Sequence, residues 1–181
     1  MYGIINIAIE GYVVATFGTP AWENIKKRIG LTLDFSTVEQ PYNDDVTYRL
    51  AEATSEETKT PIDELLTNFG EYMILATHKN YNAVMDSRGS NLKDYLVNLP
   101  NFHNRMMLIY PELTPPVFRI SNISNNSMQV HYFSKTPGIR NFVIGYLNGL
   151  VKIFNEPATV EVIQSKDEGN PEDVFKIHWH L

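Results

Sequence analysis

The stretch of sequence that decides the fold and the site is LPNFHNRMMLIY, residues 99–110. It is predicted to be a helix that begins at Pro100, because the missing N–H of a proline costs no hydrogen bond in the first turn of a helix. On a spacing of 3.6 residues, one face of this helix carries a histidine among apolar side chains: Leu99, His103, Met106, Met107 and Tyr110. A histidine in that setting is commonly a hydrogen-bonded core residue, and a ligand only where a second feature supports it.

That second feature lies further along the chain, at Tyr132 and Ser134. Alternation along a predicted strand places the two hydroxyl groups on one face. An imidazole in an apolar pocket that faces a tyrosine and a serine is consistent with a haem site, in which His103 binds the iron and the hydroxyl groups hold the propionates. The residues alone leave both interpretations of His103 open.

Length and composition limit the classes of protein to which the chain can belong. With 181 residues, 43% of them hydrophobic, it can form one domain with a sizeable core, or a compact domain with two lobes. A net charge of −6 without a basic run argues against sequence-independent nucleic-acid binding. No apolar run is long enough for a membrane span. Glu10 interrupts the N-terminal apolar stretch and no basic segment precedes it, so we expect no signal peptide.

The chain contains no cysteine. Disulfides, thiolate nucleophiles and metal or haem sites that use cysteine are therefore excluded. The lack of cysteine also fits a reducing compartment, and we expect a cytoplasmic protein. Because no phosphate-binding loop, nucleophile elbow or Ser/His/Asp arrangement appears in the sequence, we expect no enzyme active site.

Helical spacing of apolar residues dominates the first part of the chain. Gly18 and Gly30 end two predicted helices, and Asn43 and Thr60 are predicted to cap the start of two others. The segment 31–42 is predicted to be a loop. The predicted helices span 1–17, 20–29, a segment that starts at 43–45, 61–76, a short helix within 81–89, 91–98 and the helix that begins at Pro100.

After Pro115 and Pro116 the pattern changes to alternation, which indicates strands. The predicted strands are Val117–Ser121, Met128–Phe133, Ala158–Gln164 and Val174–Trp179, with a helix over Ile139–Asn155 between the second and third. A turn rich in Asn and Ser joins the first two strands into a hairpin. The predicted fold class is therefore α+β: a helical N-terminal lobe, then a four-stranded antiparallel sheet with one inserted helix.

Several short motifs together resemble those of H-NOX domains, the haem-nitric oxide/oxygen binding fold related to the sensor domain of soluble guanylate cyclase. They are MYGIIN at 1–6, PYNDDVTY at 41–48, FGEY at 69–72, NL at 98–99 with HNR at 103–105, YPELTPP at 110–116 and VIG at 143–145. Each motif is weak alone, but their order and spacing are specific, and the resemblance runs nearly end to end. It implies a single haem-binding domain over 1–181, with a distal lobe at 1–60, a proximal lobe at 61–181 and the haem between them.

The resemblance also implies roles for individual residues around a haem b. His103 is implied to be the proximal iron ligand, and Pro116 to press on the porphyrin and distort it. Ile5 is implied to lie against the porphyrin from the N-terminal lobe. Tyr132 and Ser134 match the first two residues of the family's Tyr-x-Ser-x-Arg motif, which holds the propionates.

The third position of that motif departs from the family, because Thr136 stands where the arginine is expected. A guanidinium binds a carboxylate through two charge-assisted hydrogen bonds, whereas a threonine hydroxyl donates one neutral bond. We therefore expect haem to be held more loosely than in relatives with the arginine. Two nearby cations could replace it: Lys135, if the strand ends early, or Arg140, in the first turn of the following helix.

On the opposite side of the haem, the resemblance places Phe142 where oxygen-binding relatives carry a hydrogen-bonding tyrosine. Ile9 and Met73 correspond to the helper positions, and neither is a strong donor. Bound oxygen carries partial negative charge and gains from a donor, whereas nitric oxide on ferrous iron depends on one much less. The resemblance therefore implies a preference for nitric oxide and carbon monoxide over oxygen.

Two functions are consistent with these patterns. The first is a haem-based gas sensor, not an enzyme, which acts on a separate effector; the resemblance suggests a histidine kinase or a cyclic-di-GMP enzyme. The second is a member of the same fold that binds haem weakly or not at all and serves as an interaction domain or binds another hydrophobic ligand. A visible absorption spectrum distinguishes the two.

Overall fold

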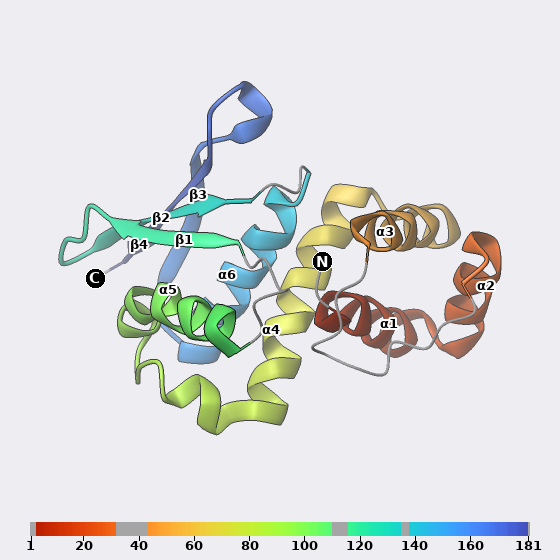
Figure 1. Ribbon diagram of the computed structural model, residues 1–181, viewed down its shortest axis with the longest axis horizontal. Coiled ribbons are helices and arrows are strands. Elements are labelled where there is room, and N and C mark those ends of the chain that lie inside the picture. The colour runs from red at the N-terminus through yellow and green to blue at the C-terminus, as the bar shows by residue number, and fades with distance from the viewer. Residues whose placement is uncertain (1–2, 32–42, 110–115, 135–137, 181) are drawn as a thin grey trace.

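The computed structural model describes residues 3–31, 43–109, 116–134 and 138–180 (Figure 1). The first part is helical and the second is a sheet with one helix inserted into its sequence. The elements are α1 (Gly3–Phe17), α2 (Thr19–Ile29), α3 (Asp44–Thr58), α4 (Ile62–Asp86), α5 (Leu92–Ile109), β1 (Val117–Ser121), β2 (Ser127–Phe133), α6 (Arg140–Phe154), β3 (Ala158–Gln164), the 3₁₀ turn η1 (Lys166–Glu168) and β4 (Asp173–Trp179). Most of the segment predicted to be a loop, at 32–42, lies outside the described residues.

Local capping explains where several helices begin and end. The side chain of Asn43 accepts a hydrogen bond from the backbone N–H of Asp45 at the start of α3, at 3.1 Å. Gly30 ends α2 in the left-handed conformation, with φ of 66°. These two boundaries confirm the predictions at Asn43 and Gly30. The predicted cap at Thr60 is wrong, because Pro61 is the N-cap residue of α4 and no side chain in the described part of the chain caps this helix.

The predicted break at Pro100 is wrong. The structure has one continuous helix, α5, with Pro100 inside it, where two helices were expected. The helix begins earlier because the Asn91 side chain accepts a hydrogen bond from the backbone N–H of Asp94, at 2.8 Å. Leu96 and Leu99 are both buried just before the proline, so packing against the core holds the helix through it. Met107, expected on the same apolar face, is 39% exposed.

A similar correction applies to α4, which continues to Asp86 where a shorter helix and a separate short helix were expected. Its only departure from helical geometry inside is at Tyr81, with φ of −137° and ψ of 40°. The two predicted helices are therefore one element with a kink. Among the described helices, none is long and apolar enough to cross a membrane.

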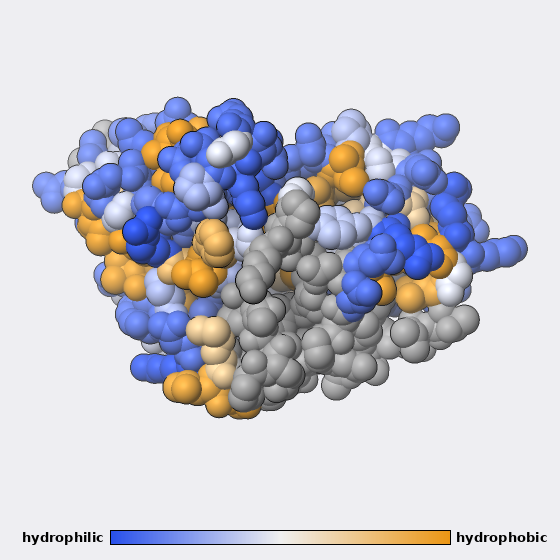
Figure 2. Space-filling model, turned by 45° about the horizontal axis from the view of Figure 1, so that its top comes forward, coloured by the Kyte–Doolittle hydropathy of each residue, from blue (hydrophilic) through white to orange (hydrophobic). Residues whose placement is uncertain are grey.

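The four strands form one antiparallel sheet in the order β1-β2-β4-β3. This confirms the predicted hairpin, the later pair of strands and the α+β class. Helices α5 and α6 lie against one face of the sheet, and α4 runs between this layer and the α1–α3 group (Figure 1). The described surface in Figure 2 is mainly hydrophilic, with apolar side chains gathered in separate patches.

The structure has two buried clusters of mainly apolar side chains, one toward the sheet and one toward helices α1–α3. One joins the inner face of the sheet to α5 and α6, and includes Leu99, Phe118, Tyr132 and Phe175. The other joins α1, α2, α3 and α4, and reaches α6 through Phe142. Helices α4 and α6 thus connect both clusters.

Helices α4 and α6 approach each other at glycines. A Cβ atom at Gly70 of α4 would lie 2.0 Å from the carbonyl oxygen of Phe142, and one at Gly145 of α6 would lie 1.9 Å from that of Thr67. Both distances are far below van der Waals contact. The backbones can therefore cross this closely only because neither position has a side chain.

Candidate functional site

His103 lies on α5 with its ring against β1. Its Nδ1 atom is 3.1 Å from the carbonyl oxygen of Pro116, and its ring meets the ring of Phe118 edge-on at 5.3 Å. Because a carbonyl oxygen can only accept a hydrogen bond, Nδ1 carries the proton in this contact. A neutral imidazole then presents a lone pair at Nε2, which is the arrangement expected of a histidine that binds a metal.

The surroundings of His103 favour the neutral imidazole. Burial lowers the pKa of His103 below its usual value, the hydrogen bond to the Pro116 carbonyl opposes this shift, and the positive charge of Arg88 adds to it. The lowered pKa of His103 therefore favours the uncharged ring.

Arg88 is a neighbour of the histidine that sequence reasoning missed. Its guanidinium carbon lies 3.5 Å from the ring centre of Phe102, and its Nη1 donates a hydrogen bond to the Tyr95 hydroxyl. The side chain is only 9% exposed. It follows α4 in a polar segment, where nothing in the local sequence separates it from a surface arginine.

The lowered pKa of His103 predicts how the stability of the haem-free protein depends on pH. Below about pH 6.5 the unfolded chain takes up a proton at His103 that the folded chain resists, so this contribution to stability is present above that pH and is lost as the pH falls. We expect urea unfolding midpoints to fall more for the wild type than for His103→Gln between pH 7.5 and 5.5. Equal losses would show that His103 is not the group responsible.

Tyr132 and Ser134 lie at the end of β2. Tyr132 is buried, and burial raises the pKa of its phenol well above 10, with a hydrogen bond to Ser134 opposing the shift. The hydroxyl therefore stays neutral and can donate at any physiological pH. The ring of Tyr132 lies 5.2 Å from that of Phe118, so Phe118 connects the tyrosine to His103. The two other candidates on this segment, Lys135 and Thr136, lie outside the described residues.

A small, partly open polar hollow adjoins the tyrosine and serine. Its lining is Tyr132, Ser134, Gly138, Ile139, Arg140, Lys166, Asp167 and Asp173. The structure places Arg140 here, with Nη1 at 2.6 Å from the Ser165 hydroxyl and 3.2 Å from the Asp167 carboxylate. Hydroxyl groups and cations are the groups expected to hold a carboxylate.

A small, partly open apolar hollow lies on the side of the N-terminal helices. Its lining is Ile5, Ile9, Thr47, Tyr48, Ala51, Leu66, Phe69, Gly138, Ile139 and Phe142. Gly138 and Ile139 border both hollows, so the two adjoin each other. Met73 packs against the same buried cluster as Ile9 and Phe142. The structure thus brings Ile5, Ile9 and Phe142 together at one hollow, with Met73 in the cluster behind it.

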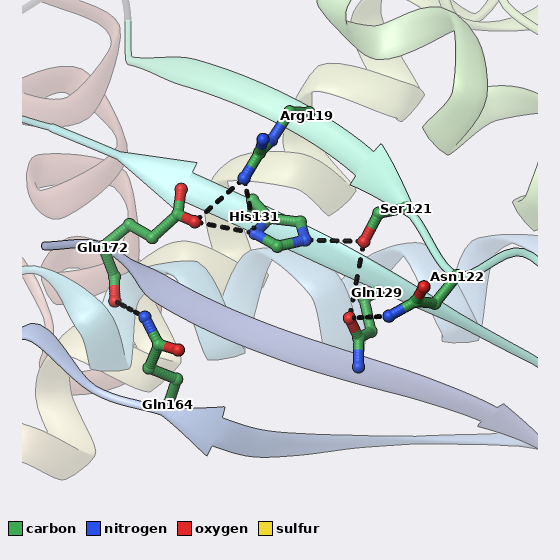
Figure 3. A network of polar contacts seen from close by, with 7 residues as sticks. All are labelled: Arg119, Ser121, Asn122, Gln129, His131, Gln164 and Glu172. Carbon is green, nitrogen blue, oxygen red and sulfur yellow. Dashed lines mark hydrogen bonds and ion pairs between the residues drawn. The ribbon is translucent and has the colours of Figure 1, made fainter. Parts of the chain in front are cut away.

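A separate polar network lies on the opposite face of the sheet (Figure 3). His131 contacts Ser121 through Nε2 at 2.6 Å and Glu172 through Nδ1 at 2.9 Å, and Arg119 also pairs with Glu172 at 3.0 Å. The side chains of Ser121, His131 and Glu172 thus form a chain of contacts. Arg119, however, contacts both the Glu172 carboxylate and the Nδ1 atom of His131. We interpret the network as a tie between β1, β2 and the segment before β4.

The family model described as haem-NO-binding matches residues 2–162 of the chain. The chain belongs to this family. Haem-NO-binding domains, also named H-NOX domains, bind haem. The match covers the His103 helix, the Tyr132–Ser134 segment and the lining of the apolar hollow, whereas Lys166, Asp167 and Asp173 of the polar hollow lie beyond it.

Individual relatives agree with this assignment. The soluble guanylate cyclase gcy-31 of Caenorhabditis elegans is 27% identical over 99% of this chain, which spans 26% of that protein. The chain therefore spans about a quarter of the length of the first curated relatives. Among solved structures, an H-NOX protein from S. oneidensis has a TM-score of 0.89 at 17% identity, covering 100% of both chains. The unliganded H-NOX protein from K. algicida has a TM-score of 0.84 at 23% identity, covering 100% of this chain and 97% of that one.

The described residues fit a haem. His103 presents Nε2, although it is not among the residues that line either hollow. Hydroxyl groups and cations suited to carboxylates line one hollow together with Asp167 and Asp173, and mainly apolar side chains line the adjoining hollow. Pro116, implied to press on the porphyrin, lies beside His103 and accepts its hydrogen bond. The roles of these residues toward haem remain predictions.

Proposed function

We propose that the chain is a haem-based sensor of nitric oxide that also binds carbon monoxide, with His103 as the proximal iron ligand. When bound, haem supplies a ferrous iron that takes these gases. The contact between His103 Nδ1 and the Pro116 carbonyl carries the proposal, because it fixes the tautomer in which Nε2 is free to bind iron. The same contact ties the ligand to the strand that follows α5.

Three side chains at or near the apolar hollow, whose lining also includes the hydroxyl groups of Thr47 and Tyr48, support a preference among gases. Ile9 and Phe142 are hydrocarbon side chains, and Met73 in the same cluster has a thioether without a hydrogen to donate. Bound oxygen develops negative charge that a donor would stabilise, and these three residues provide none. We therefore propose that the protein discriminates against oxygen.

A tyrosine at position 142 tests this discrimination. Phe142 is 7% exposed and lies at the hollow, so Phe142→Tyr adds one hydroxyl donor with little change in volume. We expect the ferrous wild type to form no stable oxygen complex in air, and the variant to hold oxygen about tenfold longer or more, as expected for a hydrogen bond to a charged group. Stopped-flow absorbance measures both.

Phe142→Leu is the matched control for that variant, since it changes the packing without adding a donor. A wild-type protein that holds oxygen stably in air would contradict the proposed selectivity. Equal oxygen lifetimes in Phe142→Tyr and Phe142→Leu would show that position 142 does not face the bound gas.

The signal is proposed to pass through α5. Nitric oxide loosens the hold of the iron on His103, and α5 then shifts relative to α1–α3, changing a surface read by a separate effector. A histidine kinase or a cyclic-di-GMP enzyme is the proposed effector. The guanylate cyclase activity in the relatives' names belongs to proteins about four times longer than this chain, and we propose a sensor rather than a catalyst.

An absorption spectrum of the purified protein tests the whole proposal. A strong Soret band that moves when nitric oxide or carbon monoxide is added supports the gas sensor. Thr136 stands in place of the arginine of the Tyr-x-Ser-x-Arg motif, and this replacement favours the second candidate, an interaction domain with weak or no haem. Absence of a Soret band after reconstitution with haem would establish that alternative.

A further inference from the structure

The polar hollow beside Tyr132 and Ser134 contains four charged side chains. They are Arg140, Lys166, Asp167 and Asp173, from α6, η1 and the start of β4. Their formal charges cancel, so the question is which of them remain uncompensated locally. Hydrogen bonds and ion pairs within the hollow answer it.

Two of the four, Arg140 and Asp167, form an ion pair, and the carboxylate of Asp173 accepts a backbone hydrogen bond. Arg140 pairs with Asp167 at 3.2 Å and also donates to the Ser165 hydroxyl at 2.6 Å. Asp173 is buried and accepts the backbone N–H of Lys166 at 2.8 Å. The arginine proposed from sequence as a replacement therefore has its charge balanced by an aspartate.

Among the described residues, the ammonium group of Lys166 is the cation of the hollow that has only a neutral partner. Its Nζ donates to the backbone carbonyl of Ser134, a neutral acceptor at the end of β2, at 2.7 Å. The same atom lies 5.9 Å from the ring centre of Phe133. Within the described ranges, Lys166 forms no ion pair. An ammonium has three donors, so two remain for a ligand that enters the hollow.

The turn that carries Lys166 is built to hold it in place. The Ser165 hydroxyl caps η1 by accepting from the backbone N–H of Asp167 at 3.2 Å, and the Asp173 contact fixes the backbone of Lys166 itself. The side chain then crosses to Ser134. The cation is thus positioned by the β3–β4 connection, not by the strand that carries the hydroxyl groups.

We propose that Lys166 is the counter-ion of a haem carboxylate. From the β3–β4 connection, it takes the role of the arginine of the Tyr-x-Ser-x-Arg motif, which Thr136 replaces in this chain. Tyr132 and Ser134 donate neutral hydrogen bonds to the same carboxylate. The proposal rests on haem binding by the family and does not depend on which gas is sensed. The arginine of the family motif and Lys166 would each place one positive charge at the carboxylate, the first from the end of β2 and the second from the β3–β4 connection.

Lys166→Gln tests the proposal, because it removes the charge and keeps a hydrogen-bond donor. We expect transfer of haem to excess apomyoglobin, followed at the Soret band, to become about tenfold faster, as for loss of one hydrogen bond to a charged group. Lys166→Arg keeps the charge and stays close to the wild type. Lys93→Gln is the matched control, since Lys93 Nζ also donates to a serine carbonyl, that of Ser124, at 2.8 Å.

The dimethyl ester of haem separates a charge contact from a structural role. With both carboxylates blocked, wild type and Lys166→Gln release the ester at the same rate. If the variant releases haem and the ester faster by the same factor, Lys166 only supports the fold and the proposal is overturned. Thr136→Arg added to Lys166→Gln is expected to restore slow transfer, because the charge returns from the family position.

Two further outcomes keep this proposal distinct from gas sensing. If the wild type responds to nitric oxide and Lys166→Gln releases haem at the wild-type rate, the role of Lys166 is wrong and the gas sensor stands. If neither protein takes up haem on reconstitution, both proposals fail. The thermal unfolding temperature of each haem-free variant shows whether the turn itself has been disturbed.

Discussion

Gly145→Ala is expected to destabilise the protein by about 2 kcal/mol or more, although alanine normally favours a helix over glycine by about 1 kcal/mol. The reason is the crossing of α4 and α6, where a Cβ atom at this position would lie 1.9 Å from the Thr67 carbonyl oxygen and 3.0 Å from the backbone nitrogen of Glu71. Both are backbone atoms, so no side-chain rotation relieves the clash. Urea unfolding measures the change.

Gly11→Ala is the matched control for this prediction. Gly11 is also inside a helix, but the atoms nearest to its added Cβ belong to the side chain of Tyr72, whose hydroxyl lies at 2.9 Å and can move away. We expect a change of less than about 1 kcal/mol there. An unchanged or raised stability of Gly145→Ala would show that the two helices separate at little cost.

The crossing also connects stability to the candidate site. Phe142 lies three residues before Gly145 on α6, and its carbonyl oxygen faces Gly70 on α4. Any separation of the two helices therefore moves Phe142 relative to Phe69, which lines the same apolar hollow.

The strands were predicted well because apolar and polar residues largely alternate along them and turn residues separate them. Val117–Ser121 and Ala158–Gln164 match the observed strands residue for residue. The helix around Pro100 was predicted wrongly. The rule that proline ends a helix considers only neighbouring residues, whereas the burial of Leu96 and Leu99 depends on distant parts of the chain. Helix boundaries that depend on tertiary packing are the ones that local signals miss.

The same distinction between local signals and distant contacts applies to the residues of the candidate site. Tyr132 and Ser134 were identified because strand alternation and a family motif point to them, and Arg140 because it is a cation in the first turn of the helix that follows the motif. Lys166 was not, since it lies in a polar turn that reads as an ordinary loop and comes to Ser134 only when β4 pairs with β2. Contacts between segments far apart in sequence carry no signal in either segment alone.

The second large effect is expected for His103→Gly, which removes the proposed iron ligand and leaves space for free imidazole. We expect haem affinity to fall by at least about a hundredfold, since even outer partners of a metal ligand contribute tenfold to a hundredfold. Added imidazole restores the Soret band by taking the place of the side chain. His180→Gly, at an exposed position, is the control and is expected to keep its haem.

Imidazole rescue also separates gas binding from signalling. In the rescued variant the ligand is no longer joined to α5, so nitric oxide still shifts the Soret band but no longer changes the backbone of that helix. Hydrogen exchange of the α5 amides before and after nitric oxide measures this, with the wild type expected to change and the rescued variant to stay the same. Identical changes in both would mean that the signal leaves the haem by another path, such as the α1 residues Ile5 and Ile9 at the apolar hollow.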